Sequence, residues 1–153
     1  MSPYISQAVT PSAVGLVITV SGAARNVMTV SFFSEVAHYP ASLWVSIHQN
    51  SYTHRLIEES GRFSLAVLHD GQKELALRCG SVSGREKDKC ADLALHAGPE
   101  GYLFPDDALT AVACRVRSRH PWNDHTLFLA DILMGELETK NSIRRHLLTM
   151  DLI

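Results

Sequence analysis

Short apolar runs separated by turn residues dominate the chain from residue 13 onwards. Residues 13–20 are apolar and rich in β-branched side chains, and the turn residues Ser21, Gly22 and Ala23 follow them. This pattern is typical of a strand that ends in a turn. Further runs bounded by Gly, Pro, Asn or Asp cover Asn26–Phe33, Leu43–His48, Arg62–Leu68, Leu109–Ser118 and Thr126–Leu137. Six strands in one small domain favour a barrel or a sandwich.

Helical signals are short and lie between or after these strands. Asn50 or Ser51 can cap a helix that reaches residue 58 or 59 and ends at Gly61 in a left-handed conformation. A second short helix is predicted over Gln72–Cys79, with Gly80 as its stop.

The last third of the chain adds a loop and a predicted helix. Residues 81–107 mix Gly, Ser, Pro and charged residues, which predicts a loose connection of a kind that often carries function. The tail Asn141–Met150 has apolar residues at helical spacing, and we expect it to pack across an end of the barrel. No Gly-x-Gly-x-x-Gly element follows the first strand, which argues against a Rossmann fold.

Composition narrows the class of protein. The 153 residues suit a single domain spanning 1–153, and 20% charged with 46% hydrophobic residues is ordinary globular usage. A net charge of -2 provides no field that would gather nucleic acid or an anionic membrane. The start of the chain has no basic and apolar leader, so we expect a cytoplasmic location.

Cysteine and histidine spacing indicates no metal site. Cys79, Cys90 and Cys114 are widely spaced without a Cys-x-x-Cys pair, so we expect reduced thiols. None of the eight histidines lies in a His-Glu-x-x-His arrangement.

The second predicted strand carries a polar stripe. Alternation places Thr29 and Ser31 on one face of Asn26–Phe33. The two hydroxyls could bond the edge of a planar polar heterocycle, or they could merely satisfy neighbouring backbone groups. The strand alone leaves both interpretations open.

Two segments are candidates for binding an anion. Residues 50–54 open a helix, so their amides and hydroxyls could cradle a phosphate, although on local evidence ordinary N-capping by Asn50 or Ser51 is the favoured explanation. Residues 81–89 bring three cations, Arg85, Lys87 and Lys89, beside a glycine and two serines, which suits an anion clamp. The alternative is a solvated loop, because Glu86 and Asp88 nearly cancel its charge.

Further positive or titratable groups follow on the last two long strands. His125, which follows Asp124, could donate a proton or order a reducing cofactor, or could simply belong to a turn. Arg115, Arg117 and Arg119 alternate on one strand face. Such a stripe is usually solvated or faces a second subunit, and it could also attract the phosphates of a dinucleotide.

The order of these features resembles the flavin reductase-like, FMN-binding split-barrel family. The resemblance is strongest in Asn26-Val27-Met28-Thr29-Val30-Ser31-Phe32-Phe33. It continues in Tyr52-Thr53-His54 with Gly61-Arg62-Phe63 downstream, in the Gly84-Arg85 and Asp88-Lys89 loop, and in His125-Thr126-Leu127-Phe128. It covers most of residues 13–137. The connection Ser21–Arg25 is short for the family, and Pro40-Ala41 replaces an expected Pro-Pro pair.

The resemblance implies a fold and a site. The fold is mainly β, a six-stranded antiparallel Greek-key split barrel with short flanking helices, and two copies pair with FMN at or near the subunit interface. Met28, Thr29, Val30 and Ser31 line the isoalloxazine, Ser46, Asn50, Ser51 and Thr53 lie by the ribityl chain and phosphate, Arg85 and Lys89 neutralise the phosphate, and His125 lies near the ring as the catalytic candidate.

The implied activity is an NAD(P)H-dependent flavin reductase. It transfers a hydride from NADH or NADPH to FMN, or to FAD as the alternative flavin, and can supply a partner monooxygenase with reduced flavin. Two other hypotheses are a non-catalytic FMN-binding electron-transfer protein and a dimeric scaffold without flavin.

Overall fold

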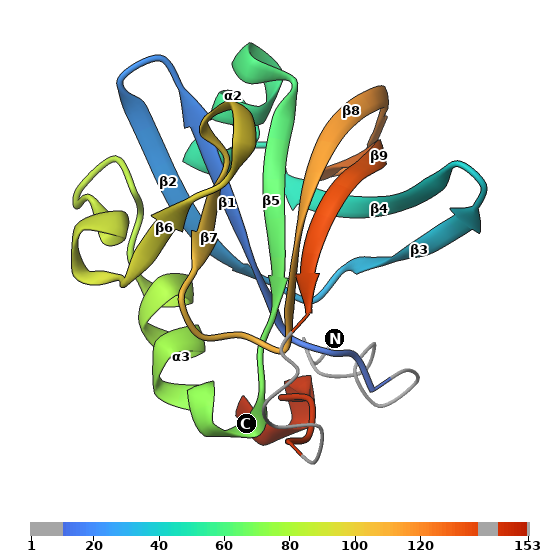
Figure 1. Ribbon diagram of the computed structural model, residues 1–153. Helices are drawn as coiled ribbons and strands as arrows, with labels where there is room; N and C mark the ends of the chain where they lie inside the picture. The colour runs from blue at the N-terminus through green and yellow to red at the C-terminus, as the bar shows by residue number, and fades with distance from the viewer. Residues whose placement is uncertain (1–10, 138–143, 153) are drawn as a thin grey trace.

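The computed structural model describes residues 11–137 and 144–152, which form a coiled antiparallel sheet flanked by two α-helices and a small hairpin (Figure 1). The hydrogen-bonded order of the sheet is β2 (Ala24–Val30), β1 (Gly15–Ser21), β5 (Arg62–Val67), β8 (Thr110–Trp122), β9 (His125–Leu137), β4 (Ala41–His48) and β3 (Phe33–His38). The predicted mainly β class is confirmed. The described sheet has seven strands rather than six, because residues 33–38 form a strand of their own.

The two edge strands of the sheet are neighbours in sequence. β2 and β3 lie at opposite ends of the strand order, yet only Ser31 and Phe32 separate them. At this point the Ser46 amide donates to the Phe32 carbonyl at 2.9 Å. The sheet must therefore curl until its edges meet there, while the β2-β1 and β4-β3 hairpins diverge (Figure 1).

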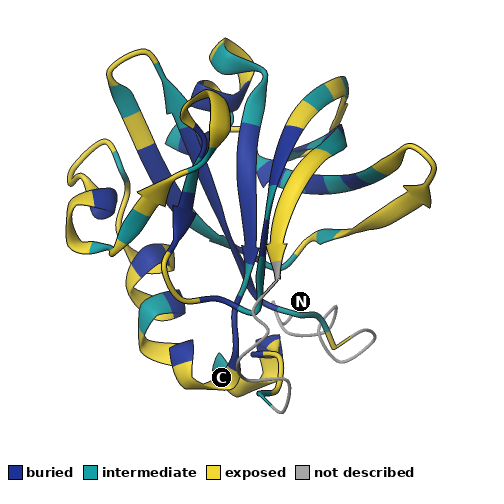
Figure 2. Cartoon of the chain, viewed as in Figure 1, coloured by how far each residue is buried: buried dark blue, intermediate teal, exposed yellow. Residues whose placement is uncertain are grey.

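Strands β1 and β5 are buried on both faces. Along β1, Leu16 and Ile18 belong to one apolar cluster, and Val17 belongs to the other, which contains Phe63 and Phe128. Figure 2 shows this burial as dark blue along β1 and β5, with exposed yellow along β3. Burial on both faces explains why residues 14–18 form a continuous apolar run rather than an alternating one.

Helix α2 (Tyr52–Ser60) confirms the capping prediction. Ser51 is the N-cap, and its hydroxyl accepts from the His54 amide at 3.1 Å. Gly61 ends the helix with φ 69°, and its amide donates to the Ile57 carbonyl. Ile57 is fully buried, so the apolar face of the helix packs onto the barrel.

Helix α3 (Lys73–Ser81) runs one residue past its predicted stop. Gly80 lies inside the last turn, so its prediction as the terminator is wrong. A Cβ at Gly80 would lie 3.4 Å from the Thr29 Cβ, so this glycine permits close packing of α3 on β2. No helix in the described part of the chain is long and apolar enough to cross a membrane.

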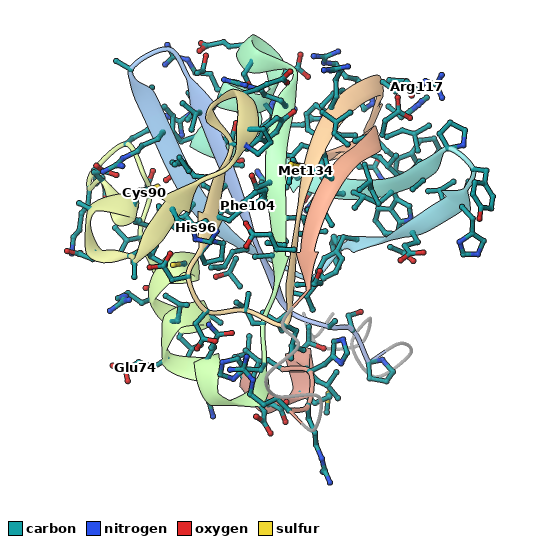
Figure 3. The ribbon with its side chains drawn as sticks, in the orientation of Figure 1. Glu74, Cys90, His96, Phe104, Arg117 and Met134 are labelled. Atoms are coloured by element: carbon teal, nitrogen blue, oxygen red, sulfur yellow. The ribbon has the colours of Figure 1, made fainter. Side chains whose placement is uncertain are left out.

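The predicted loose connection over residues 81–107 is wrong in its second half. Residues 95–105 form a hairpin of β6 (Leu95–Ala97) and β7 (Leu103–Pro105), and Phe104 is fully buried beneath it. His96 stands beside Phe104 (Figure 3) and lies 2.7 Å from both Asp106 Oδ1 and Glu136 Oε1. These contacts hold the hairpin against β9, although its Gly- and Pro-rich sequence suggests a loop.

The predicted C-terminal helix is wrong wherever the tail is described, and residues 141–143 lie outside that part. Residues 144–148 are extended, and Thr149–Leu152 form a 3₁₀ turn. The Leu147 amide donates to the Leu68 carbonyl, and the Leu147 carbonyl accepts from the Val14 amide. Backbone partners on both sides therefore favour an extended segment, despite the helical spacing of its apolar side chains.

Candidate functional site

A cavity of about 450 Å³ lies between β2, the start of α2 and the connection that follows α3. This volume is within the usual range for small-molecule sites. The residues that line it are Asn26, Met28, Thr29, His48, Asn50, Ser51, Tyr52, Thr53, Cys79, Gly80, Ser81, Val82, Ser83, Gly84, Arg85 and Lys89. Most of the predicted flavin-binding residues are thus brought together in one place from three separate segments.

The β2 wall of the cavity carries two polar side chains, Thr29 and Asn26, which differ in how fully they are hydrogen-bonded. The Thr29 hydroxyl donates to the Ala76 carbonyl of α3, which fits the backbone-satisfying interpretation of this threonine. Asn26 is buried, and its Nδ2 donates to Thr53 Oγ1 at 2.9 Å. Asn26 Oδ1 is buried without a hydrogen-bond partner among the described residues. The backbone of Gly84 packs against this oxygen.

The start of α2 presents free amides to the cavity. The Ser51 hydroxyl is used as the N-cap, as simple capping predicts. The amides of Tyr52 and Thr53 have no acceptor within the described part of the chain, and both residues line the cavity. Free amides at the positive end of a helix favour an anion, so the capping and cradle interpretations are compatible.

Two cations from the connection after α3 reach the cavity. Lys89 is only 9% exposed, and its Nζ donates to the Cys79 carbonyl at 2.8 Å. Burial lowers the pKa of Lys89, and no carboxylate pairs with it in the described residues. Arg85 is exposed, donates from Nη1 to the Asn50 carbonyl at 3.0 Å and lies 5.5 Å from the Tyr52 ring centroid. Lys89 and Arg85 therefore give the cavity positive charge that an anionic ligand could pair with.

Two other charged residues of the same loop form ion pairs outside the cavity. Lys87 pairs with Asp92 at 2.9 Å, and Asp88 pairs with Arg25 at 3.1 Å. Neither pair joins two residues of 81–89, so the charges of the loop are balanced by Asp92 and Arg25 rather than by Glu86 and Asp88.

A glycine lets the loop dock on β2. A Cβ at Gly84 would lie 2.0 Å from Asn26 Oδ1, an impossible contact. Any side chain at this position would push the loop away from Asn26, and with it the wall that carries Arg85.

His125 lies beyond the cavity lining and is connected to it through His48. His125 Nδ1 is 2.8 Å from Asp124 Oδ1, and the His125 and His48 rings are 5.4 Å apart. His48 itself lines the cavity, and its Nδ1 accepts from the Asn50 amide at 3.1 Å. Sequence reasoning missed His48, although its place two residues before a predicted helix cap was an available signal.

Three predicted flavin contacts lie away from the cavity lining. Val30 is buried in the barrel core, Ser31 follows the end of β2, and Ser46 lies along β4. Contact between these residues and a flavin stays a prediction.

The arginine stripe on β8 has the exposed alternation that the sequence predicts. Arg115, Arg117 and Arg119 lie 3.8, 3.5 and 3.2 Å from Glu100, Asp131 and Glu58, respectively. Each guanidinium already has a carboxylate partner, which favours the solvated interpretation over a dinucleotide site.

Comparison with known proteins places this geometry in a family context. A model of the flavin reductase-like domain matches residues 7–150. The NADH-dependent FMN reductase AsuE2 of Streptomyces nodosus subsp. asukaensis is 30% identical over 131 residues, which cover 84% of this chain and 69% of AsuE2. The reductase component of the FADH(2)-dependent resorcinol hydroxylase of Rhizobium sp. (strain MTP-10005) is 28% identical over 111 residues, 72% of this chain and 61% of that protein.

A solved structure agrees with these matches. The FMN-binding protein from Thermus thermophilus with bound p-hydroxybenzaldehyde superposes with a TM-score of 0.84 at 27% identity, covering 90% of this chain and 81% of that one.

Proposed function

The chain belongs to the flavin reductase-like family, and on that premise we propose that it binds FMN and reduces it with NADH or NADPH. One observation carries the proposal. A buried ammonium without a carboxylate partner in the described residues lies at the same cavity as the start of α2, where the Tyr52 amide has no acceptor among the described residues. A phosphate monoester is the group that such a cradle suits.

The residues present fit FMN. The Tyr52 and Thr53 amides with Lys89 and Arg85 would hold the phosphate, and Asn50 and Ser51 would lie beside it. Met28, Thr29, Val30 and Ser31 would border the ring system from β2, and Ser46 would lie toward the ribityl chain.

The protein contributes positioning, charge and a proton carrier. Bound FMN supplies the hydride-accepting chemistry. Lys89 acts from a buried position, where its charge is screened less than that of a surface lysine. His125 donates from Nδ1 to Asp124, which leaves Nε2 to hold or release a proton.

We also propose that two copies pair and that the reduced flavin, FMN or FAD, serves a partner monooxygenase. Tyr39 and Trp122 are 97% and 77% exposed, and exposed aromatic side chains favour an interface. The Rhizobium relative is a reductase component of a hydroxylase, which supports delivery of reduced flavin to another enzyme.

The test is spectroscopic. Purified protein is titrated with FMN and then mixed anaerobically with NADH and, separately, NADPH. We expect a bound flavin whose absorbance band bleaches rapidly with at least one donor. A bound flavin that stays oxidised with both donors would favour an electron carrier, and absence of both binding and bleaching would contradict the proposal.

The phosphate clamp gives a sharper prediction. Lys89→Gln and Arg85→Ala should each weaken FMN binding about ten- to hundredfold, because each removes a charge-assisted bond. Fluorescence quenching measures the dissociation constant. Lys87→Ala is the matched control, since Lys87 lies in the same loop but pairs with Asp92. Unchanged affinity in both test variants would remove them from the site.

A further inference from the structure

The turn between β4 and α2 depends on an unprotonated imidazole nitrogen. His48 Nδ1 accepts a hydrogen bond from the Asn50 amide at 3.1 Å. The ring proton of neutral His48 must then be on Nε2, which lies 3.9 Å from Asp124 Oδ2. A second proton would occupy Nδ1 and abolish its role as acceptor. This turn is therefore complete only while His48 is neutral.

The same turn carries one wall of the cavity. The His48 carbonyl accepts from the Ser51 amide at 3.0 Å and from the Ser51 hydroxyl at 2.8 Å, and that hydroxyl is the cap of α2. The Asn50 carbonyl accepts from Arg85 Nη1. A single residue thus connects the helix cap, the free amides beyond it and the arginine.

We propose that His48 is a positioning residue whose neutral ring holds the Asn50 amide and thereby orients the anion cradle, so that protonation of His48 weakens binding. The inference rests on the proposed function, because the anion in question is the FMN phosphate. His48 lines the cavity, and the proposed role is the one it has through its bond to the Asn50 amide.

Several charged or titratable groups face His48. Asp124 and His125 approach from the start of β9, and His54 interacts with it from α2. Arg85 lines the same cavity from the loop. A second ring proton on His48 would occupy Nδ1, where the Asn50 amide now donates.

Two variants separate the hydrogen bond from the titration. In His48→Asn, the side-chain oxygen can accept from the amide two residues on, as in an Asx-turn, but it does not titrate. His48→Ala removes the acceptor altogether. FMN dissociation constants are measured by fluorescence quenching from about pH 8 to about pH 5, where histidine changes charge.

We expect His48→Ala to bind FMN about two- to tenfold more weakly than the wild type at about pH 8, the effect of one lost hydrogen bond. His48→Asn should bind nearly as well there and should lose less affinity than the wild type as the pH falls. Titration of the phosphate itself is common to all three proteins and cancels in the comparison. A wild-type pH profile in His48→Asn, or unchanged affinity in His48→Ala, would overturn the inference.

A measurement without flavin keeps this test separate from the proposed function. Long-range proton–nitrogen NMR spectra of the ligand-free protein report which ring nitrogen carries the proton. We expect a bare Nδ1 and a protonated Nε2 in His48 at about pH 8. A protonated Nδ1 would refute the positioning role even if FMN binds, whereas failure to bind any FMN would refute the proposed function alone.

Discussion

The turns that follow β4 and β5 are built alike but surrounded differently. In each, a histidine Nδ1 accepts from the amide two residues on, His48 from Asn50 and His69 from Gly71, both at 3.1 Å. The His69 side chain is 10% exposed and its Nε2 lies 2.9 Å from Asp107, whereas the His48 side chain is 43% exposed and its Nε2 lies 3.9 Å from Asp124. The same hydrogen bond thus stabilises the fold at His69, which is buried. At His48 it borders a cavity, and there we propose that it responds to pH.

Further hydrogen bonds hold the turn at His69. The His69 amide donates to Gln72 Oε1, and Gln72 Nε2 donates to the Asp107 carbonyl. The next residue, Asp70, donates its amide to the Arg145 carbonyl of the tail. This network joins three segments that are distant in sequence, so its loss should affect stability rather than binding.

The largest expected effect is therefore on unfolding. His69→Ala should lower the free energy of unfolding by about 2–3 kcal/mol, because it removes a cap and a part-buried bond to a carboxylate. Denaturant titration measures this change. His69→Asn keeps an acceptor for Gly71 and should be affected less, while His48→Ala should lose less than about 1 kcal/mol. Equal losses at both histidines would erase the distinction between the turns.

A smaller effect is expected at the carboxylate. The hydrogen bond from His69, followed by that from Arg144, lowers the pKa of Asp107 below its ordinary value. The stabilisation is thus present above the unfolded-state pKa, near about 3.9, and is lost as the pH falls through the lower folded-state value. Because the Asp107 side chain is 58% exposed, we expect less than about 1 kcal/mol.

Thermal unfolding of Asp107→Asn at several pH values measures this contribution. The wild type should exceed the variant in melting temperature above about pH 5, and the gap should narrow toward about pH 3. A gap that widens in acid would contradict the assigned direction of the pKa shift.

Local signals predicted the elements whose ends are set by local chemistry. Ser51 and Gly61 mark α2 because a cap hydroxyl and a left-handed glycine act within a few residues. β3 escaped prediction because Phe33–His38 is largely exposed and is held by backbone pairing with β4. The tail was predicted as a helix because its apolar residues have helical spacing. That spacing does not reveal the hydrogen bonds of Leu147 with the Leu68 and Val14 backbone.

The candidate site was predictable where its residues belong to family motifs, as with Met28, Thr53 and Lys89. The role of His48 could not be foreseen, because it depends on where the Asn50 amide points and on the distance to Asp124 across two strands. The burial of Lys89 was equally hidden in a loop whose sequence charges nearly cancel.

Lys89 couples the cavity to the stability of the whole chain. Folding transfers the Lys89 ammonium out of water. Among the described residues, its Nζ donates a hydrogen bond only to the Cys79 carbonyl. The ligand-free chain thus folds against a desolvation cost that an anion in the cavity can offset. Occupancy then adds RT ln(1 + [L]/Kd) to the free energy of unfolding. A ligand bound in this way would be a component of the native state, and the chain would be most resistant to unfolding where that ligand is abundant.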